Sequence, residues 1–413
     1  RDSENECDMF LFADDTSLLE VITDPIISFE KINRDLSRLH VWSNQWLVKF
    51  NPTKTKYIVF SKKLHTLNYT DLYINNEKLQ KVKQHKQLGI IFNERMTWEH
   101  HINENCKKAM NRLTALKRIG SKIPRKSKLK IYISFIRPVL EFGFQLYDNC
   151  TDELSDKIEH VQRECLLFVT GAYKKTSHRE LLKEVGLTTL EKRRTMQKIQ
   201  FIYKAKHNQL PTYLQDVIPG TVGDMNNYNL CNLDNIIQIK TKKSYFLKSH
   251  IPSAIKAWND SSIDVKRALS LQTLKAKLSD LYGSSTYHLF LAEDGHGAVN
   301  HSRIRMGLSA LNAQRKRYNF IESSKCNFCN HKCENPKHFF LYCPAFQTQR
   351  QVMLGEMDRH IPGAVQPYLN YLDRKQLALE FCSIIITGTG NTETDMHLFK
   401  IVQNFISDTN RFR

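Results

Sequence analysis

The sequence predicts an α+β fold, in which a small antiparallel sheet with a helix precedes a mostly α-helical chain and a small Cys/His region. Three patterns support this prediction. Short apolar runs broken by turn residues fill residues 1–100, as is typical of strands. Beyond residue 102 the apolar residues recur at intervals of three and four, the period of an amphipathic helix. Close to the end of the chain, cysteines and histidines gather at the spacing of a metal site.

Length and charge narrow the class of protein. The 413 residues suffice for about two or three domains with cores of their own. The 61 Lys and Arg residues exceed the 42 Asp and Glu residues, and the formal net charge of +19 predicts attraction to a polyanion, above all nucleic acid. A basic surface without such a partner is the alternative.

The cysteines and the apolar runs indicate in which cellular compartment the protein is expected. No apolar run reaches the length of a membrane span, and no signal peptide is recognisable, so we expect neither a membrane partner nor secretion. Apart from one tight group the ten cysteines are scattered, which favours a reducing compartment over a disulfide framework. We therefore expect an intracellular protein, in the nucleus and the cytoplasm.

The first expected element is a β-hairpin. An apolar run enters the adjacent residues Asp14 and Asp15, and a second apolar run leaves them at Leu18. Two neighbouring carboxylates repel each other unless a cation lies between them, and paired divalent metal ions commonly supply that cation. The sequence Ala13-Asp14-Asp15-Thr16 is also ordinary turn chemistry, so both interpretations stay open.

A helix and several strands should follow the hairpin. Asp24 and Pro25 predict a helix start, and an apolar stripe from Phe29 to Leu39 should pack this helix under the sheet. We expect Trp42 and Trp46 in the core. The next expected elements are a turn over residues 51–53, strands over 57–60 and 88–92, and a strand that runs into a turn over 72–77.

From residue 102 the character of the sequence becomes helical. One face of the first helix is apolar, and other faces are basic, which suits binding to a phosphate backbone. The basic residues are Lys107, Lys108, Arg112, Lys117 and Arg118. Further helices are expected over residues 129–136, ending at Pro138, and over 154–168 and 181–203. The Asn- and Lys-rich residues 220–243 read as a linker or an exposed insertion.

The Cys/His group is the strongest chemical signal. Cys326, Cys329, His338 and Cys343 follow the spacing Cys-x2-Cys-x8-His-x4-Cys, and two thiolates from a tight turn with a later His and Cys complete a tetrahedron around Zn²⁺. His331 and Cys333 lie within the long gap as spare candidates. The alternative is a chance cluster of reduced cysteines.

Motifs at residues 10–19, 42–60, 88–102 and 326–343, in this order, resemble those of reverse transcriptases of the non-LTR (LINE-type) retrotransposons. The resemblance implies a two-metal polymerase site, in which Asp14 and Asp15 bind Mg²⁺ and Lys54 protonates the leaving pyrophosphate. A solvated lysine in a basic loop is the alternative for Lys54. The resemblance also places Leu88 and Gly89 at the element that grips the primer, where a glycine allows close backbone approach.

The same resemblance divides the chain. It implies a partial palm with primer-grip strands, a helical thumb and connector, a linker with a helical extension, a basic helix with a zinc knuckle, and a last segment of unknown role. These regions are expected at residues 1–100, 101–218, 219–292, 293–350 and 351–413. The implied partners are an RNA template, a DNA primer and deoxynucleotides, and the oligomeric state stays open.

The family site needs a third aspartate from an earlier strand, and neither Asp2 nor Asp8 lies in a matching motif. We therefore expect the carboxy-terminal part of a larger RNA-directed DNA polymerase, inactive on its own. The alternative is a non-enzymatic nucleic-acid-binding remnant of a degenerate element. Its basic helix and zinc knuckle would still bind RNA or DNA without polymerising.

Overall fold

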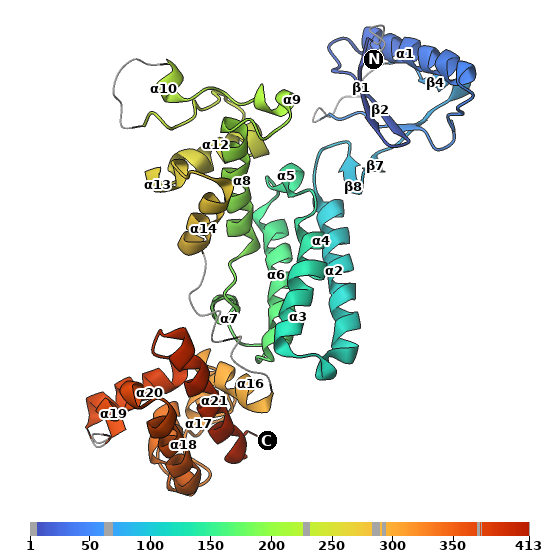
Figure 1. Ribbon diagram of the computed structural model, residues 1–413. Helices are drawn as coiled ribbons and strands as arrows, with labels where there is room; N and C mark the ends of the chain where they lie inside the picture. The colour runs from blue at the N-terminus through green and yellow to red at the C-terminus, as the bar shows by residue number, and fades with distance from the viewer. Residues whose placement is uncertain are drawn as a thin grey trace. The chain divides into compact units, whose positions relative to one another are not determined.

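The computed structural model describes residues 6–61, 69–225, 232–282, 290, 295–369, 372 and 374–412. The chain divides into two compact units, which we call the N-terminal unit (Arg1–Asn103) and the C-terminal unit (Glu104–Arg413). The first carries the strands and one long helix, and the second is helical (Figure 1). The described part of the chain is therefore α+β, as the sequence predicts.

The strands of the N-terminal unit pair two by two. Three pairs are antiparallel, and β3 with β6 is parallel. The pairs are β1 (Asp8–Phe12) with β2 (Asp15–Leu19), β3 (Lys56–Tyr57) with β6 (Gln80–Lys81), β4 (Tyr73–Ile74) with β5 (Glu77–Lys78), and β7 (Gln84–Gln87) with β8 (Ile90–Asn93). Within the described residues these four pairs remain separate two-stranded sheets, where one palm sheet was expected.

Helix α1 (Pro25–Gln45) starts where the sequence predicts. The Asp24 carboxylate accepts hydrogen bonds from the backbone N–H groups of Ile26 and Ile27, at 2.9 and 3.0 Å, and Pro25 occupies the first turn. This arrangement satisfies donors that a helix start otherwise leaves unpaired. The buried side of α1, with Phe29 and Leu36, packs on residues of the β4–β5 hairpin and its flanks.

The expectation that Trp42 and Trp46 are core residues is wrong. Their side chains are 40% and 64% exposed. The buried positions of α1 include Phe29, Leu36 and Ser43, which are seven residues apart and share one face. Trp42 lies beside that face, and Trp46 caps the end of the helix, so neither is carried into the core.

Two expected strands are shorter than the sequence suggests. The strand expected over residues 57–60 is limited to β3, and the strand expected over residues 88–92 starts only at Ile90. Leu88 and Gly89 form the turn between β7 and β8, with φ values of 47° and 84°. A positive φ favours glycine, so the turn explains Gly89 without close approach of a second backbone.

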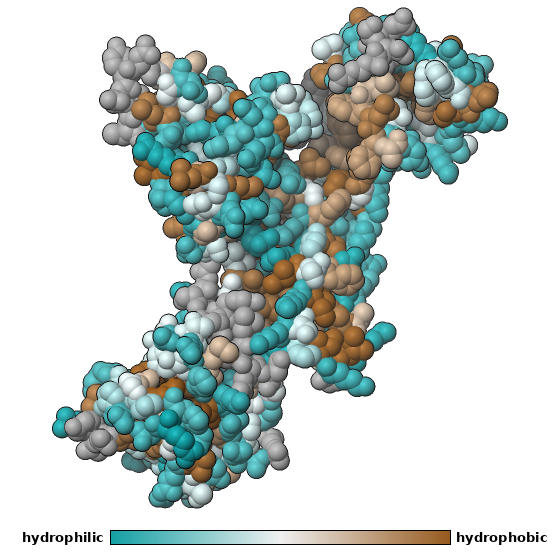
Figure 2. Space-filling view, in the orientation of Figure 1, coloured by the Kyte–Doolittle hydropathy of each residue, from teal (hydrophilic) through white to brown (hydrophobic). Residues whose placement is uncertain are grey.

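The β1–β2 hairpin exposes apolar side chains. Phe10, Leu11 and Phe12 are 57%, 67% and 65% exposed, and part of this surface is brown at the upper right of Figure 2. Successive strand residues point to opposite faces, so an apolar run in a two-stranded sheet places such side chains on both sides.

The C-terminal unit begins inside helix α2 and continues with a set of packed helices. A π-helical turn links α3 to α4, and the helix expected to end at Pro138 therefore continues to Glu141. A π-turn accommodates a proline because the local hydrogen bonds are already rearranged. The elements are α2 (Glu99–Ile119), α3 (Arg125–Ile131), the π-turn η2 (Tyr132–Ile136), α4 (Arg137–Glu141), α5 (Phe144–Tyr147) and α6 (Asp152–Thr170).

A second group of helices surrounds Trp258, which is fully buried. The indole N–H donates to the carbonyl oxygen of Asp234 at 3.0 Å, and Ile236 is buried in the same core. This end of the expected linker over residues 220–243 is thus packed. The helices that contribute buried residues to this core are α8 (Leu190–Lys206), α12 (His250–Asp260), α13 (Ile263–Lys266) and α14 (Leu271–Tyr282). The other helices of this stretch are α7 (His178–Val185), which packs on α6, and the short α9 (Thr212–Gln215), α10 (Val222–Met225) and α11 (Ser244–Leu247).

The last helices share one core, which we call the C-terminal core. It contains Cys326, Phe339 and Phe340 together with Phe399 and Phe405, so it includes residues on both sides of the expected boundary at 350. The elements are α16 (His296–Arg305), α17 (Asn312–Arg317), the π-turn η3 (His338–Tyr342), η4 (Pro344–Phe346), α18 (Gln347–His360), α19 (Pro362–Leu369), α20 (Lys375–Thr387) and α21 (Thr392–Asp408).

A buried ionic network ties α16 to the earlier helices of the same unit. The Glu184 carboxylate on α7 accepts hydrogen bonds from Arg305 at 2.6 and 2.7 Å and from the Ser302 hydroxyl, and Arg125 lies 3.8 Å away. Nearby, Arg303 donates to the carbonyl oxygen of Gly171 at 2.6 and 2.9 Å.

None of the helices in the described ranges has both the length and the apolar character that crossing a membrane requires.

Candidate metal centre and nucleic-acid interface

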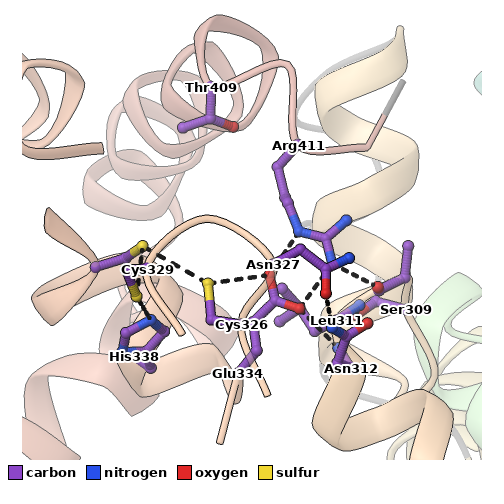
Figure 3. Close-up of polar contacts among 12 residues, drawn as sticks. Ser309, Leu311, Asn312, Cys326, Asn327, Cys329, Glu334, His338, Thr409 and Arg411 are labelled. Carbon is purple, nitrogen blue, oxygen red and sulfur yellow. Dashed lines mark hydrogen bonds and ion pairs between the residues drawn. The ribbon is translucent and has the colours of Figure 1, made fainter. Parts of the chain in front are cut away.

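The four expected zinc ligands lie together. One possible ligand atom from each of Cys326, Cys329, His338 and Cys343 is within 4.8 Å of those of the other three. The Sγ atom of Cys343 lies 3.9 Å from that of Cys326 and 3.7 Å from that of Cys329, and His338 Nε2 lies 3.3 Å from Cys329 Sγ (Figure 3). The four side chains thus surround one point.

The spacing of these atoms fits a tetrahedral Zn²⁺ site. With Zn–S bonds of about 2.3 Å and Zn–N bonds of about 2.0 Å, tetrahedral geometry places two sulfurs roughly 3.8 Å apart and sulfur and nitrogen roughly 3.5 Å apart. The observed sulfur–sulfur distances of 3.7 and 3.9 Å match the first value. Three thiolates and one imidazole are also the donors that zinc prefers, so the donor set and the geometry agree.

Local turns bring the ligands to this point. The backbone N–H of Cys326 donates to the carbonyl oxygen of His331 at 2.9 Å, and that of Asn330 donates to the carbonyl oxygen of Cys326 at 3.0 Å. Asn330 has a φ of 57°, which lets the chain reverse tightly after the second thiol. The π-turn η3 then carries His338, and the N–H of Cys343 donates to the His338 carbonyl at 2.8 Å.

The two spare candidates lie outside the cluster. The His331 ring stacks on the His338 ring, with centroids 4.3 Å apart and planes 7° from parallel. His331 Nδ1 accepts a hydrogen bond from the N–H of Cys333 at 3.3 Å. The His331 ring therefore lies beside the ligand His338, and the group of four includes neither His331 nor Cys333.

Burial favours the neutral forms of Cys326, His338 and Cys343. It raises the pKa of Cys343 to about 12 and also raises the pKa of Cys326, while it lowers the pKa of His338. Thiols of this kind become thiolates when a cation offsets the cost of burial, and metal binding would release their protons. Four protein ligands also close a tetrahedral shell, which is typical of a structural site.

The structure places Asp14 and Asp15 at the tip of the β1–β2 hairpin. Ala13 and Asp14 form the turn, and Asp15 lies opposite Phe12 in the register of the strands. Ala13 has a φ of 53°, a conformation that costs a non-glycine residue on the order of 1–2 kcal/mol. Both carboxylates are exposed. Mg²⁺ usually binds oxygen ligands from one or two carboxylates, and waters and substrate phosphates complete its shell. Asp14 and Asp15 therefore fit that ion.

Lys54 is exposed in a tight turn of the same unit. Its N–H donates to the carbonyl oxygen of Asn51 at 3.1 Å, and Thr53 N–H donates to the Asn51 side chain at 3.0 Å. The predicted Asn-Pro-Thr turn is therefore confirmed. Among the described residues, Lys54 forms no ion pair with Asp14 or Asp15, so the structure does not join the three residues into one contact network.

The basic helix keeps most of its charges in solvent. Lys107, Lys117 and Arg118 are exposed on α2, and Lys108 is exposed while pairing with Glu104 at 3.0 Å. Arg112 differs from the others. It donates to the carbonyl oxygen of Phe135, and its guanidinium lies 4.2 Å from the centre of the Phe135 ring. Arg112 is thus engaged in helix packing.

Sequence reasoning missed two residues that contact the metal loop. Glu334 is buried and forms an ion pair with the partly buried Arg411, with 2.5 Å between Arg411 Nε and Glu334 Oε1. The only local signal is that Glu334 lies between the ligands Cys329 and His338, in a polar stretch of the sequence. Neither periodicity nor spacing in the sequence links Glu334 to Arg411, which lies 77 residues away.

Comparison with known proteins gives the family context. No protein-family model and no solved structure matches the chain. Curated relatives include the RNA-directed DNA polymerase from mobile element jockey of Drosophila melanogaster, 25% identical over 165 residues, which are 39% of this chain and 18% of that protein. The jockey polymerase of Drosophila funebris is 24% identical over 173 residues, 41% of this chain and 19% of that protein.

A further relative is the probable RNA-directed DNA polymerase from transposon BS of Drosophila melanogaster, 23% identical over 183 residues, which are 44% of this chain and 20% of that protein. The matched region thus spans about a fifth of the length of each of these relatives. Over about two-fifths of its length the chain is therefore similar in sequence to RNA-directed DNA polymerases of LINE-type mobile elements.

Proposed function

We propose that the chain forms part of an RNA-directed DNA polymerase of a LINE-type element and binds the RNA template and DNA primer. The observation that carries this proposal is the exposed pair Asp14 and Asp15 at a hairpin tip, in a relative of such polymerases. In the intact enzyme these two carboxylates would hold Mg²⁺. That ion would activate the primer hydroxyl and neutralise charge on the phosphates.

The remaining residues of the proposed site would contact the nucleotide, the primer and the phosphate backbone. Lys54, exposed in its turn, would approach the incoming deoxynucleotide and donate a proton to the leaving pyrophosphate. Leu88 and Gly89, in the turn between β7 and β8, would contact the primer. The exposed Lys107 and Lys117 of α2 would follow the phosphate backbone, as a thumb does.

We further propose that zinc binds to Cys326, Cys329, His338 and Cys343 in a structural role. The convergence of one possible donor atom from each residue within 4.8 Å supports this assignment. The closed shell of four protein ligands leaves no position for a substrate or a reactive water. The zinc would therefore stabilise the C-terminal core and take no part in nucleotidyl transfer.

On its own the chain should bind nucleic acid but not extend a primer, because Asp14 and Asp15 supply only part of the carboxylate set of a two-metal polymerase site. The test is a primer-extension assay on the purified chain with Mg²⁺, deoxynucleotides and an annealed RNA–DNA primer-template. Incorporation above background that is lost in Asp14→Asn would show that the two carboxylates suffice, or that another group completes the set.

The second candidate function is nucleic-acid binding without catalysis, as in a remnant of a degenerate element. The exposed basic face of α2 favours it, because phosphate contacts require no catalytic residues. Fluorescence anisotropy with the same primer-template measures the binding that both candidates share. A chain that binds no nucleic acid at low salt would contradict both.

A further inference from the structure

We infer that Arg411 positions the metal-binding loop by clamping Glu334, so that residues 351–413 serve as the scaffold of the zinc site. This inference rests on the proposed zinc binding, and it assigns a role to the segment for which the sequence offered none. Glu334 and Arg411 contact the ligands and their loop without being ligands themselves, and they are therefore positioning residues.

The clamp is a buried, two-pronged ion pair. Arg411 donates from Nε to Glu334 Oε1 at 2.5 Å and from a terminal nitrogen to Oε2 at 2.7 Å (Figure 3). The Glu334 side chain is 1% exposed and that of Arg411 is 9% exposed. The same terminal nitrogen donates to the carbonyl oxygen of Ala310 at 3.0 Å. Such paired hydrogen bonds fix both the distance and the orientation of the two groups.

Glu334 connects the clamp to the metal loop. Its backbone N–H donates to the carbonyl oxygen of Ser324 at 2.7 Å, which closes the loop that carries the first two thiols. Its Oε2 also accepts the backbone N–H of Asn312 at 2.9 Å. The Asn312 side chain in turn donates to the carbonyl oxygen of Lys325, next to the first ligand, at 2.5 Å.

The charge of the clamp bears directly on a ligand. Glu334 Oε1 lies 3.9 Å from the Sγ atom of Cys326. Three thiolates and one Zn²⁺ carry a net charge of −1, so an unpaired carboxylate at this distance would repel the loaded site. The guanidinium of Arg411 neutralises the Glu334 carboxylate. It also lies 5.5 Å from the ring centre of Phe328, a residue between Cys326 and Cys329 in the sequence.

Helix α21 delivers Arg411 to this place. The helix packs on α16 and α18, and Phe405 on it contacts Phe339 of the π-turn, with ring centres 5.3 Å apart. Asn410, with a φ of 50°, turns the chain after the helix, and Phe412 then packs on Phe339 at 5.3 Å. Arg411 is therefore held between two aromatic contacts to the segment that carries His338 and Cys343.

A second arginine, one residue before this segment and on α18, supports the scaffold role. Arg350 on α18 is buried and donates to the carbonyl oxygen of Phe340 at 2.9 Å and to that of Cys343 at 2.5 Å. It therefore fixes the backbone at the last ligand, as the clamp fixes the loop of the first two. Partners of this kind typically change metal affinity by about 10- to 100-fold when they are removed.

The test is the Zn²⁺ affinity of the chain Arg1–Arg413, measured by competition with a chromophoric chelator. We expect Arg411→Ala to bind Zn²⁺ about 10- to 100-fold more weakly than wild type, because it leaves Glu334 buried and unpaired beside a thiolate. The double variant Arg411→Ala/Glu334→Gln should recover only part of the affinity, since it removes the unpaired charge but does not restore the clamp. Arg411→Lys, which keeps the charge and loses the two-pronged geometry, should fall between wild type and Arg411→Ala.

Arg359→Ala is the matched control, because Arg359 forms an exposed ion pair with Glu356 on α18 of the same unit. It should leave the Zn²⁺ affinity unchanged. If wild type binds one Zn²⁺, and Arg411→Ala and Arg411→Lys bind it as tightly as wild type, the clamp is refuted and the metal assignment stands. Wild type that binds no Zn²⁺ would overturn the metal assignment, and the clamp with it. A double variant as weak as Arg411→Ala would also refute the charge argument.

Discussion

Replacing Glu184 by glutamine should destabilise the contact between α7 and α16 by about 3 kcal/mol. The Glu184 side chain is 2% exposed, and it receives hydrogen bonds from Arg305 and Ser302, with Arg125 at 3.8 Å. Burial by itself raises the pKa of this carboxyl group. The charges of Arg305 and Arg125 and the hydrogen bonds outweigh burial and lower the pKa to about 2.

The magnitude follows from two independent arguments. A pKa of about 2 in the folded chain against an ordinary value of 4.5 corresponds to about 3 kcal/mol of stabilisation of the ionised form. Removing one partner of a buried ion pair typically costs about 3–5 kcal/mol, because the other charge stays buried. Glutamine keeps the shape of the side chain and removes the charge, so Arg305 and Arg125 would lose their counter-ion.

Hydrogen exchange measured by mass spectrometry is the appropriate assay, because a chain of two compact units does not have one well-defined free energy of unfolding. A loss of about 3 kcal/mol should make the amides of α7 and α16 exchange roughly 100-fold faster in Glu184→Gln. The control is Glu356→Gln, whose exposed pair with Arg359 should contribute less than about 1 kcal/mol. Equal protection of α7 and α16 in both variants would refute the reasoning.

Three further predictions concern pH, metal and nucleic acid. Because the pKa of Glu184 is lower in the folded chain, its stabilisation is complete above pH 4.5 and is lost as pH falls toward 2. The ratio of the amide exchange rates of α7 and α16 in Glu184→Gln to those in wild type should therefore shrink over this pH range, and a constant ratio would contradict the prediction. Cys333→Ser should retain one zinc per chain by elemental analysis and Cys329→Ser should lose it, and the opposite result would reassign the ligands. Replacing Lys107 and Lys117 by alanine should reduce the slope of log affinity against log salt by roughly 1 to 2, and an unchanged slope would move the binding surface away from α2.

The sequence by itself determined the features that depend on near neighbours. The start of α1 follows from the Asp24 cap and Pro25, which act within one helical turn. The β1–β2 hairpin follows from two apolar runs around a two-residue turn. The grouping of Cys326, Cys329, His338 and Cys343 follows from spacing in a short loop, since ligands 17 residues apart have little freedom to separate.

Only the tertiary structure decided which helix faces are covered and which distant residues meet. The periodicity of α1 indicates an apolar stripe, but whether Trp42 is buried depends on where the β4–β5 hairpin packs, and the hairpin leaves it exposed. Gly89 could serve close backbone approach or a turn, and the pairing of β7 with β8 selects the turn.

The largest gap between sequence and structure is at the metal centre. The ligands are local, whereas their support comes from Arg411, 77 residues beyond Glu334, and from Arg350 on α18. An ion pair leaves no periodic trace in the sequence, because one glutamate and one arginine among many charged residues look like solvated surface. Their burial follows from the way α21 packs on the C-terminal core, and that packing depends on the whole chain from α16 onward.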